Sequence, residues 1–316
     1  MINHILAPLD GSSLAECVLP HVVASAHAFG ARVTLLRVLD EMITEGVVPI
    51  SPVNWHLVRA KGERYLADVA QRLADAGCEV DTVLLEGKAA EEIISFADQN
   101  AVDMTILSSH GRSGLYRWNS SSVAQKVIFE AKSSVLIVRA YRAADAAMHE
   151  FRYGKILVPL DCSRRAECVL PFATMLAGYG EGTLLLAHVV VPPQLPRRAP
   201  LTEHERALVA EVVELNIETA ESYLQETNAS LSVNSEIRLL SEHDAAGALH
   251  DLVDAEEPDL VVICAHGHTG ARRWPFASLA LNLIVYGSTP LLVVQDLPAD
   301  EQHTSWASAA KESKGH

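Results

Sequence analysis

One segment of the sequence occurs twice, and this repeat limits what the chain can fold into more than any other feature. Residues 5–20 return as residues 156–171, and the two segments are identical at 12 of 16 positions. Further along, residues 105–111 are echoed by residues 261–267. A period of about 150 residues is far longer than the roughly 20–50 residues of a solenoid unit. The repeat therefore predicts two copies of one domain.

The domain boundaries follow from the repeat and from composition. We expect the first domain at 1–140 and the second at 154–296, joined by the residues between them. The last segment, 297–316, contains small and polar residues without a core-forming pattern. Such a composition buries too little apolar surface to offset the entropy of ordering, so we expect a disordered tail.

Within each copy, short β-branched runs alternate with longer segments of helical apolar spacing. This alternation is typical of a parallel sheet covered by helices. The predicted fold class is α/β: two tandem doubly wound domains, each a five-stranded parallel sheet in the order 3-2-1-4-5 with helices on both faces. The expected strands are 3–9, 32–39, 79–86, 103–108 and 134–139, then 155–160, 183–190, 232–240, 259–264 and 290–295. The expected helices are 13–29, 54–76, 89–100 and 121–131, then 164–179, 202–228, 242–256 and 277–287.

The helix expected at 202–228 has a periodicity that assigns its faces. Its spacing lets Leu208, Val212, Leu215 and Tyr223 face the sheet. Glutamates on another side of the same helix predict a solvated face.

Charge and composition exclude several classes of function. Against 40 Asp and Glu the chain has 25 Lys and Arg, so its net charge of −15 has the wrong sign for nucleic-acid binding. No apolar run approaches the roughly 18 residues of a membrane span, and no basic leader precedes the first strand. We expect a cytoplasmic protein without a membrane partner. The five cysteines form no C-x-x-C pair, which predicts free thiols.

Candidate ligand-binding residues follow the predicted strands, because ligands of open parallel sheets bind beyond the carboxyl ends of the strands. Asp10 and Asp161 each follow the first strand of their copy. A carboxylate there can accept hydrogen bonds from a ribose. It can equally cap the next helix, since a serine follows two residues later, and both interpretations stay open.

A small-residue loop follows the fourth strand of each copy and leads to a helix. The loops are residues 108–114 and 264–270, and the helices begin near Ser120-Ser121-Ser122 and Ala277-Ser278. Loop and helix-start N–H groups can approach a phosphate. Neither G-x-x-x-x-G-K-[ST] nor G-x-G-x-x-G occurs. We expect no metal site and no Ser-His-Asp triad, because ligand spacing and a nucleophile elbow are both missing.

Together, the strand-one Asp, the His-Gly loop and the serine-rich helix start resemble the universal stress protein family, in a tandem form covering residues 1–296. The resemblance implies a five-stranded α/β fold and binding of ATP as a cofactor. In the first domain it implies a pocket lined by Pro8, Asp10, Val38, Leu107, Ser108, Gly111, Ser121, Ser122 and Val123. In the second it implies a pocket lined by Pro159, Asp161, Val189, Ile263, Cys264, Gly267, Ala277, Ser278 and Leu279.

ATP-binding members carry the pattern Gly-x-x-Gly-x9-Gly-[Ser/Thr], and this chain keeps only the middle glycine in each copy. Ser108 and Ser121 replace the others in the first copy, and Cys264 and Ala277 replace them in the second. A Cβ costs energy where a backbone must adopt positive φ or approach a phosphate. Because serine is small and can donate a hydrogen bond, we expect ATP to bind mainly within residues 1–140.

The leading function is thus a stress-response protein that binds or senses an adenine nucleotide and acts through conformation or partners. A nucleotide-free scaffold or interaction module and a slow ATP hydrolase are the alternatives. We also expect the two domains to pair as an intramolecular pseudo-dimer through their last strands, since unpaired strand edges invite other chains. Whether whole chains assemble further, as a homo-oligomer, is left open by the sequence.

Overall fold

The computed structural model describes residues 2–39, 52–109, 123–140, 148–193, 200–266 and 276–296. The chain divides into two compact units. The first contains Met1–Arg152 and the chain from Leu292 on, and the second contains Tyr153–Ala271 and Phe276–Leu291.

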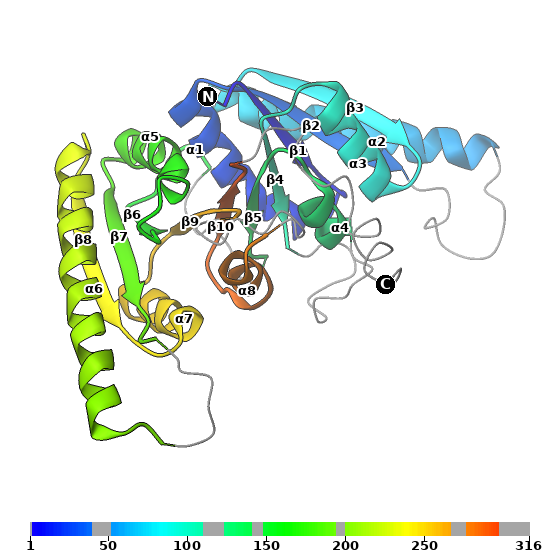
Figure 1. The fold of residues 1–316 in the computed structure, drawn as a ribbon. Helices are drawn as coiled ribbons and strands as arrows, with labels where there is room; N and C mark the ends of the chain where they lie inside the picture. Colours follow the sequence, from blue (N-terminus) through cyan, green and yellow to red (C-terminus); the bar gives the residue numbers. More distant parts are fainter. Residues whose placement is uncertain are drawn as a thin grey trace. The chain divides into compact units, whose positions relative to one another are not determined.

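The elements of both copies follow the same order, as Figure 1 shows. The first copy contains β1 (His4–Pro8), η1 (Ala15–Val18), α1 (Leu19–Phe29), β2 (Arg32–Leu39), α2 (Pro52–Asp75), β3 (Val80–Glu86), α3 (Ala89–Gln99), β4 (Met104–Ser108), α4 (Val123–Glu130) and β5 (Ser134–Val138). The second contains β6 (Lys155–Pro159), η2 (Ala166–Val169), α5 (Leu170–Gly180), β7 (Thr183–Val190), α6 (Glu203–Ser230), β8 (Ser235–Ser241), α7 (Ala245–Glu256), β9 (Leu260–Cys264), α8 (Ser278–Tyr286) and β10 (Leu291–Val294).

The sheet topology confirms the predicted fold class. The strand order is β3-β2-β1-β4-β5 in the first copy and β10-β9-β6-β7-β8 in the second. Counted from the start of each copy, both are the predicted order 3-2-1-4-5. Strands β1 and β2 pair in parallel with His4 opposite Arg32, and β6 and β7 pair in parallel with Lys155 opposite Thr183. Helices pack on these strands, for example α2 on β2 and β3, and α6 on β7 and β8.

The first helix of each copy begins later than its predicted start. Residues 15–18 and 166–169 form 3-10 turns, and the α-helices begin at Leu19 and Leu170. Pro20 and Pro171 occupy the first turn of these α-helices. Proline has no N–H to donate to the preceding turn and its fixed φ suits the first turn, so the regular helix starts beside it.

An aspartate ties the first and fourth strands together at their amino ends. Asp103 Oδ2 accepts the N–H groups of Asn3 at 2.7 Å and His4 at 3.0 Å. Asp259 Oδ2 accepts those of Gly154 at 2.8 Å and Lys155 at 2.9 Å. The same aspartate contacts fix the amino end of the central strand in both copies. The carboxyl ends of the strands therefore have a defined position.

The predicted inward face of α6 is wrong for its first half. Leu208, Val212 and Leu215 are 47%, 43% and 62% exposed. The less exposed stripe is one residue further along: Val209, Val213 and Ile217 are half-buried, and Ala220, Leu224 and Thr227 are buried. Neighbouring positions on a helix differ by 100°, and packing selects the second of two adjacent apolar stripes.

Among the described helices, none is long and apolar enough to span a membrane.

We predict that His21 makes the first domain sensitive to acid. Its ring is buried on α1 and lies 4.6 Å from the ring of Phe151, and burial lowers the pKa of His21 to about 3. The unfolded chain protonates this imidazole near pH 6.5, so its contribution to stability is complete above pH 6.5 and is lost as the pH falls toward 3.

The His21→Phe variant removes this titration. Between pH 6 and 4, the free energy of unfolding measured with urea should fall less steeply in the variant than in the wild type. The difference in slope should be about 1.4 kcal/mol per pH unit. Parallel curves would show that His21 is protonated equally in both states.

Candidate functional site

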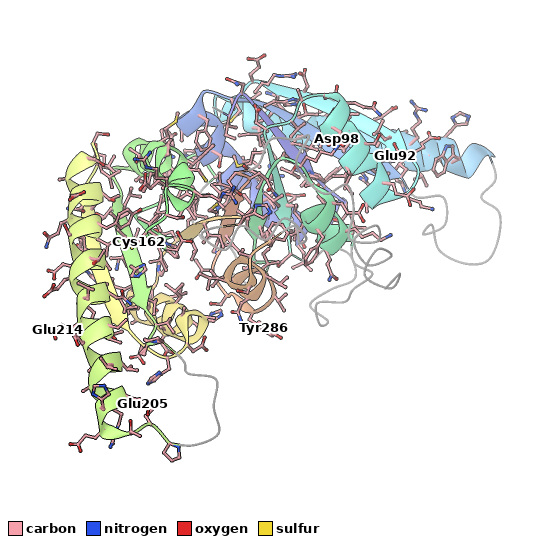
Figure 2. All side chains as sticks on the ribbon, in the orientation of Figure 1. Glu92, Asp98, Cys162, Glu205, Glu214 and Tyr286 are labelled. Atoms are coloured by element: carbon pink, nitrogen blue, oxygen red, sulfur yellow. The ribbon has the colours of Figure 1, made fainter. Side chains whose placement is uncertain are left out.

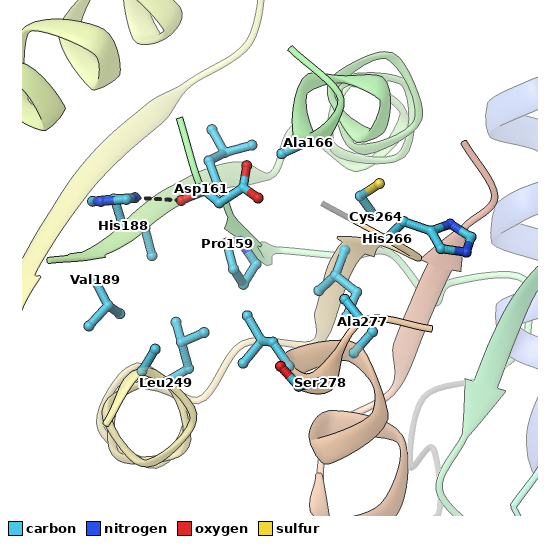
Figure 3. A pocket seen from close by; sticks show the side chains of 16 residues that line it. Pro159, Asp161, Ala166, His188, Val189, Leu249, Cys264, His266, Ala277 and Ser278 are labelled. Atoms are coloured by element: carbon cyan, nitrogen blue, oxygen red, sulfur yellow. Dashed lines mark hydrogen bonds between the residues drawn. The ribbon is translucent and has the colours of Figure 1, made fainter. Parts of the chain in front are cut away.

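A cavity of about 260 Å³ lies at the carboxyl ends of the strands in the second domain. Figure 3 shows side chains from β6, β7, β9, α7 and α8 around it. Its lining residues are Pro159, Leu160, Asp161, Ala166, Ala187, His188, Val189, Ala245, Leu249, Ile263, Cys264, His266, Ala277, Ser278, Leu279 and Ala280. It is thus a mainly apolar cavity with a few polar groups, the usual composition of a small-molecule site.

The structure brings together eight of the nine residues expected for the second pocket. They are Pro159, Asp161, Val189, Ile263, Cys264, Ala277, Ser278 and Leu279. The ninth, Gly267, lies outside the described residues.

In the first domain, the described members of the expected pocket occupy the corresponding places. Pro8 ends β1, Val38 lies near the end of β2, Leu107 and Ser108 end β4, and Val123 begins α4. Gly111, Ser121 and Ser122 lie outside the described residues. The expected residues of the two domains therefore correspond at the ends of the strands.

Both strand-one aspartates form the same tight turn. Asp10 Oδ1 accepts the Ser12 N–H at 2.8 Å and the Ser12 hydroxyl at 2.6 Å, and Ser12 Oγ accepts the Ala15 N–H at 3.2 Å. Asp161 makes the same bonds to Ser163, whose hydroxyl accepts the Ala166 N–H. Serine, not aspartate, therefore caps the following turn.

The residue after each aspartate, Gly11 or Cys162, adopts a left-handed backbone. The side chain next to it on the second strand of its domain, β2 or β7, differs between the copies. Gly11 has φ +83°, and a Cβ there would lie 2.9 Å from Arg37 Nη1. In the second copy Cys162 has φ +60°, and its sulfur lies 3.5 Å from His188 Nδ1. His188 takes the place of Arg37 at the repeat offset, and a ring shorter than arginine makes room for the Cβ.

This exchange also changes the charge beside the site. The Arg37 guanidinium lies next to the Asp10 turn and 5.2 Å from the ring centre of Tyr65. In the second domain, His188 Nδ1 bonds to the Leu160 carbonyl oxygen at 2.7 Å (Figure 3). The first site therefore has a permanent cation at the position where the second has a histidine.

A tyrosine lies near the turn that follows the first strand of each domain. Burial and the nearby Glu16 raise the pKa of Tyr65, and burial and the nearby Glu167 raise that of Tyr223. Both phenols therefore stay neutral at any physiological pH.

Helix α8 begins at the cavity. Its N-cap residue, Ala277, has an extended backbone, and its N–H donates to the Ala265 carbonyl oxygen at 2.7 Å. The first N–H groups of a helix have no partner within the helix, and an alanine side chain cannot accept from them. With the Ser278 hydroxyl at the same place, this end of the cavity offers donors to an anion.

Several lining residues were missed by the sequence analysis. Ala245 and Leu249 come from α7, and His188 comes from β7. The Arg37 and His188 pair could have been found by comparing the two copies at the repeat offset. Within the described part of the chain, no three His, Cys, Asp or Glu side chains could hold a metal ion.

We predict that Gly11→Ala destabilises the first domain by about 1–2 kcal/mol, because alanine resists positive φ and its Cβ would meet Arg37. Arg37→His, which copies the second domain, should reduce this cost. A double-mutant cycle on urea unfolding measures the coupling. Equal costs in both backgrounds would exclude the contact with Arg37 as a cause.

Comparisons with known proteins agree with this geometry. The model of the universal stress protein family matches residues 1–139 and 152–295. A universal stress protein of Methanocaldococcus jannaschii is 30% identical over 143 residues, covering 44% of this chain and 83% of the relative. A universal stress protein of Mycolicibacterium smegmatis is 23% identical over 304 residues, covering 92% of this chain and 96% of the relative.

Solved structures match over nearly the full length. A universal stress protein from Archaeoglobus fulgidus has a TM-score of 0.64 at 17% identity, over 93% of this chain and 96% of the other. A putative universal stress protein from Pseudomonas aeruginosa has a TM-score of 0.67 at 16% identity, over 99% and 98%. At these identities the structures show the fold alone. The family match on both copies shows that the chain belongs to the universal stress protein family, with two such domains in tandem.

Proposed function

We propose that this protein binds an adenine nucleotide at the carboxyl edge of its sheets. The observation that carries the proposal is the 260 Å³ cavity, lined by Asp161 and seven further residues expected from the family pattern. Ligand cavities commonly span roughly 300–1,000 Å³. The second-domain cavity is therefore nearer the size of a nucleoside than of a whole triphosphate, whose phosphates would lie toward the α8 end.

In this proposal the carboxylates of Asp10 and Asp161 accept hydrogen bonds from the ribose hydroxyls of the nucleotide. Asp161 follows the central strand β6 at the cavity wall, and a carboxylate is an acceptor suited to the vicinal hydroxyls of a ribose. The apolar side chains of Val189, Leu249 and Ile263 offer the surface against which a flat base packs. Asp10 has the same turn in the first domain.

The first domain is proposed as the tighter ATP site. Arg37 next to the Asp10 turn adds a positive charge that attracts an anionic ligand to the first domain, whereas the second domain has His188 at this place. Ser108 and Ser121 carry hydroxyls where the second copy has Cys264 and Ala277. Action through conformation or partners and not through rapid turnover remains part of the proposal.

Calorimetric titration of ATP tests this assignment. Asp10→Ala should weaken the tighter site by roughly 10- to 100-fold, the usual cost of losing a hydrogen bond to a charged group. Asp161→Ala should leave the tighter site intact. Ser12→Ala and Ser163→Ala are the matched controls, because they remove the turn contacts and keep the carboxylates.

Each other outcome has a defined meaning. Loss of the tighter site in Asp161→Ala alone would reverse the order of the domains. An equal loss in Ser12→Ala would make Asp10 a turn residue only. Absence of binding in the wild type would favour the scaffold, and steady release of phosphate would favour the slow hydrolase.

A second candidate, an interaction module, is favoured by the exposed stripe of Leu208, Val212 and Leu215 on α6. The stripe is flanked by Glu211 and Glu218, and Figure 2 shows Glu205 and Glu214 on the same helix. An apolar stripe with acidic flanks complements an amphipathic helix with basic flanks. We therefore assign such a segment of another protein as its partner.

A synthetic 18-residue Leu/Lys amphipathic peptide serves as the probe of this surface. The variant Leu208→Ser/Leu215→Ser should bind the fluorescent peptide at least about tenfold more weakly than the wild type. Leu57→Ser is the matched control, since Leu57 is 56% exposed on the corresponding helix α2. Equal weakening by the control, or none by the double variant, would contradict the candidate.

A further inference from the structure

Two cysteines of the second domain occupy places at which the first domain holds a cysteine and a serine. Cys168 lies in η2 within Ala-Glu-Cys-Val, the same four residues that form η1 around Cys17. Cys264 ends β9 as Ser108 ends β4. In the first domain, Cys17 Sγ lies 3.6 Å from Ser108 Oγ and donates to it.

The surroundings of the two pairs also agree. Segment η2 packs on β9 as η1 packs on β4. In Figure 3 the Cys264 sulfur points toward the η2–α5 segment, on the side of the cavity where Ala166 lies. The repeat therefore places the Cys168 thiol opposite Cys264, in the position that Cys17 holds opposite Ser108.

We propose that Cys168 and Cys264 form a reversible disulfide in the wall of the second-domain cavity. All five cysteines are free thiols in this structure. The first domain has no equivalent, because Ser108 cannot form the bond. This disulfide can therefore form in one domain of the tandem pair and not in the other.

The geometry requires only a local adjustment. A disulfide has an S–S length of about 2.05 Å, whereas the first-domain pair is in contact at 3.6 Å. At the separation of the first-domain pair, the Cys168 and Cys264 sulfurs would have to approach by about 1.5 Å, which side-chain rotation and a small shift of the 3-10 turn supply. The 3-10 turn η2 is short and is followed by a separate helix, so the shift need not move β9.

Hydrogen peroxide is the oxidant that balances the reaction. The Cys168 sulfur, the more exposed of the two, attacks the O–O bond, takes one oxygen to become a sulfenic acid, and water leaves. The Cys264 thiol then attacks the sulfenic sulfur, the S–O bond breaks, and the hydroxyl leaves as a second water with the thiol proton. Two thiols and one peroxide give one disulfide and two waters.

Peptide mapping tests the proposal directly. Trypsin places the five cysteines on five different peptides, 1–32, 73–88, 156–164, 166–197 and 239–272. The intact protein is treated with hydrogen peroxide, alkylated and digested without reductant. Mass spectrometry should find peptides 166–197 and 239–272 linked, and dithiothreitol should separate them.

The controls use the chain's own repeat. Cys264→Ser copies the first-domain pair and should abolish the link, whereas Cys17→Ser and Cys162→Ser should leave it in place. A link through peptide 156–164, a link between two chains, or full alkylation of Cys168 and Cys264 after peroxide would overturn the proposal.

A second measurement concerns the cavity and rests on the proposed nucleotide binding. In Asp10→Ala, which retains the second site, oxidation should change the affinity for ATP at least about threefold, because Cys264 lines the cavity. Cys264→Ser in the same background should show no change. Unchanged affinity in linked protein would overturn the effect on the cavity and leave the disulfide established.

Discussion

Each domain depends on the pairing of its central strand on both sides. Strand β1 pairs with β2 and β4, and β6 pairs with β7 and β9. The middle residues of both strands, such as Leu6 and Leu157, are fully buried. Backbone N–H and C=O groups in such an interior must find partners, and the two ladders supply them. A shift of the central strand would break both ladders, so the residues that follow it are held in place.

The fixed central strand determines where the residues of the site lie. Asp10 and Asp161 come two residues after the central strands end, and the loops after β4 and β9 begin at the same edge of the sheet. The aspartates at the opposite end, Asp103 and Asp259, bind the N–H groups that precede or begin the central strand. A chain that fixes both ends of its central strand in this way can vary the side chains around the cavity at little cost to the fold. The two copies show such variation at Gly11 and Arg37 against Cys162 and His188.

Much of this arrangement could be predicted from the sequence, because the strands are short apolar runs and the repeat aligns them twice. The predicted start of the first helix missed the role of Pro20, which separates a 3-10 turn from the α-helix. The face of α6 was wrong because Leu208 and Val209 both begin apolar stripes, and only packing on the sheet selects one. Of the site, the residues at strand ends were predicted. Leu249 was not, since nothing in its local sequence shows that α7 reaches the cavity.

The backbone conformation at the replaced glycine positions shows whether a side chain is strained there. Ser108 and Cys264 end strands and are not among the described residues with positive φ, and Ala277 has φ −64°. A Cβ at these three positions therefore causes no backbone strain, contrary to the cost expected there. The Ser108 side chain contacts Cys17, so its added atoms pack against η1. What distinguishes the two strand-one turns is the residue beside each aspartate, which is Arg37 in the first copy and His188 in the second.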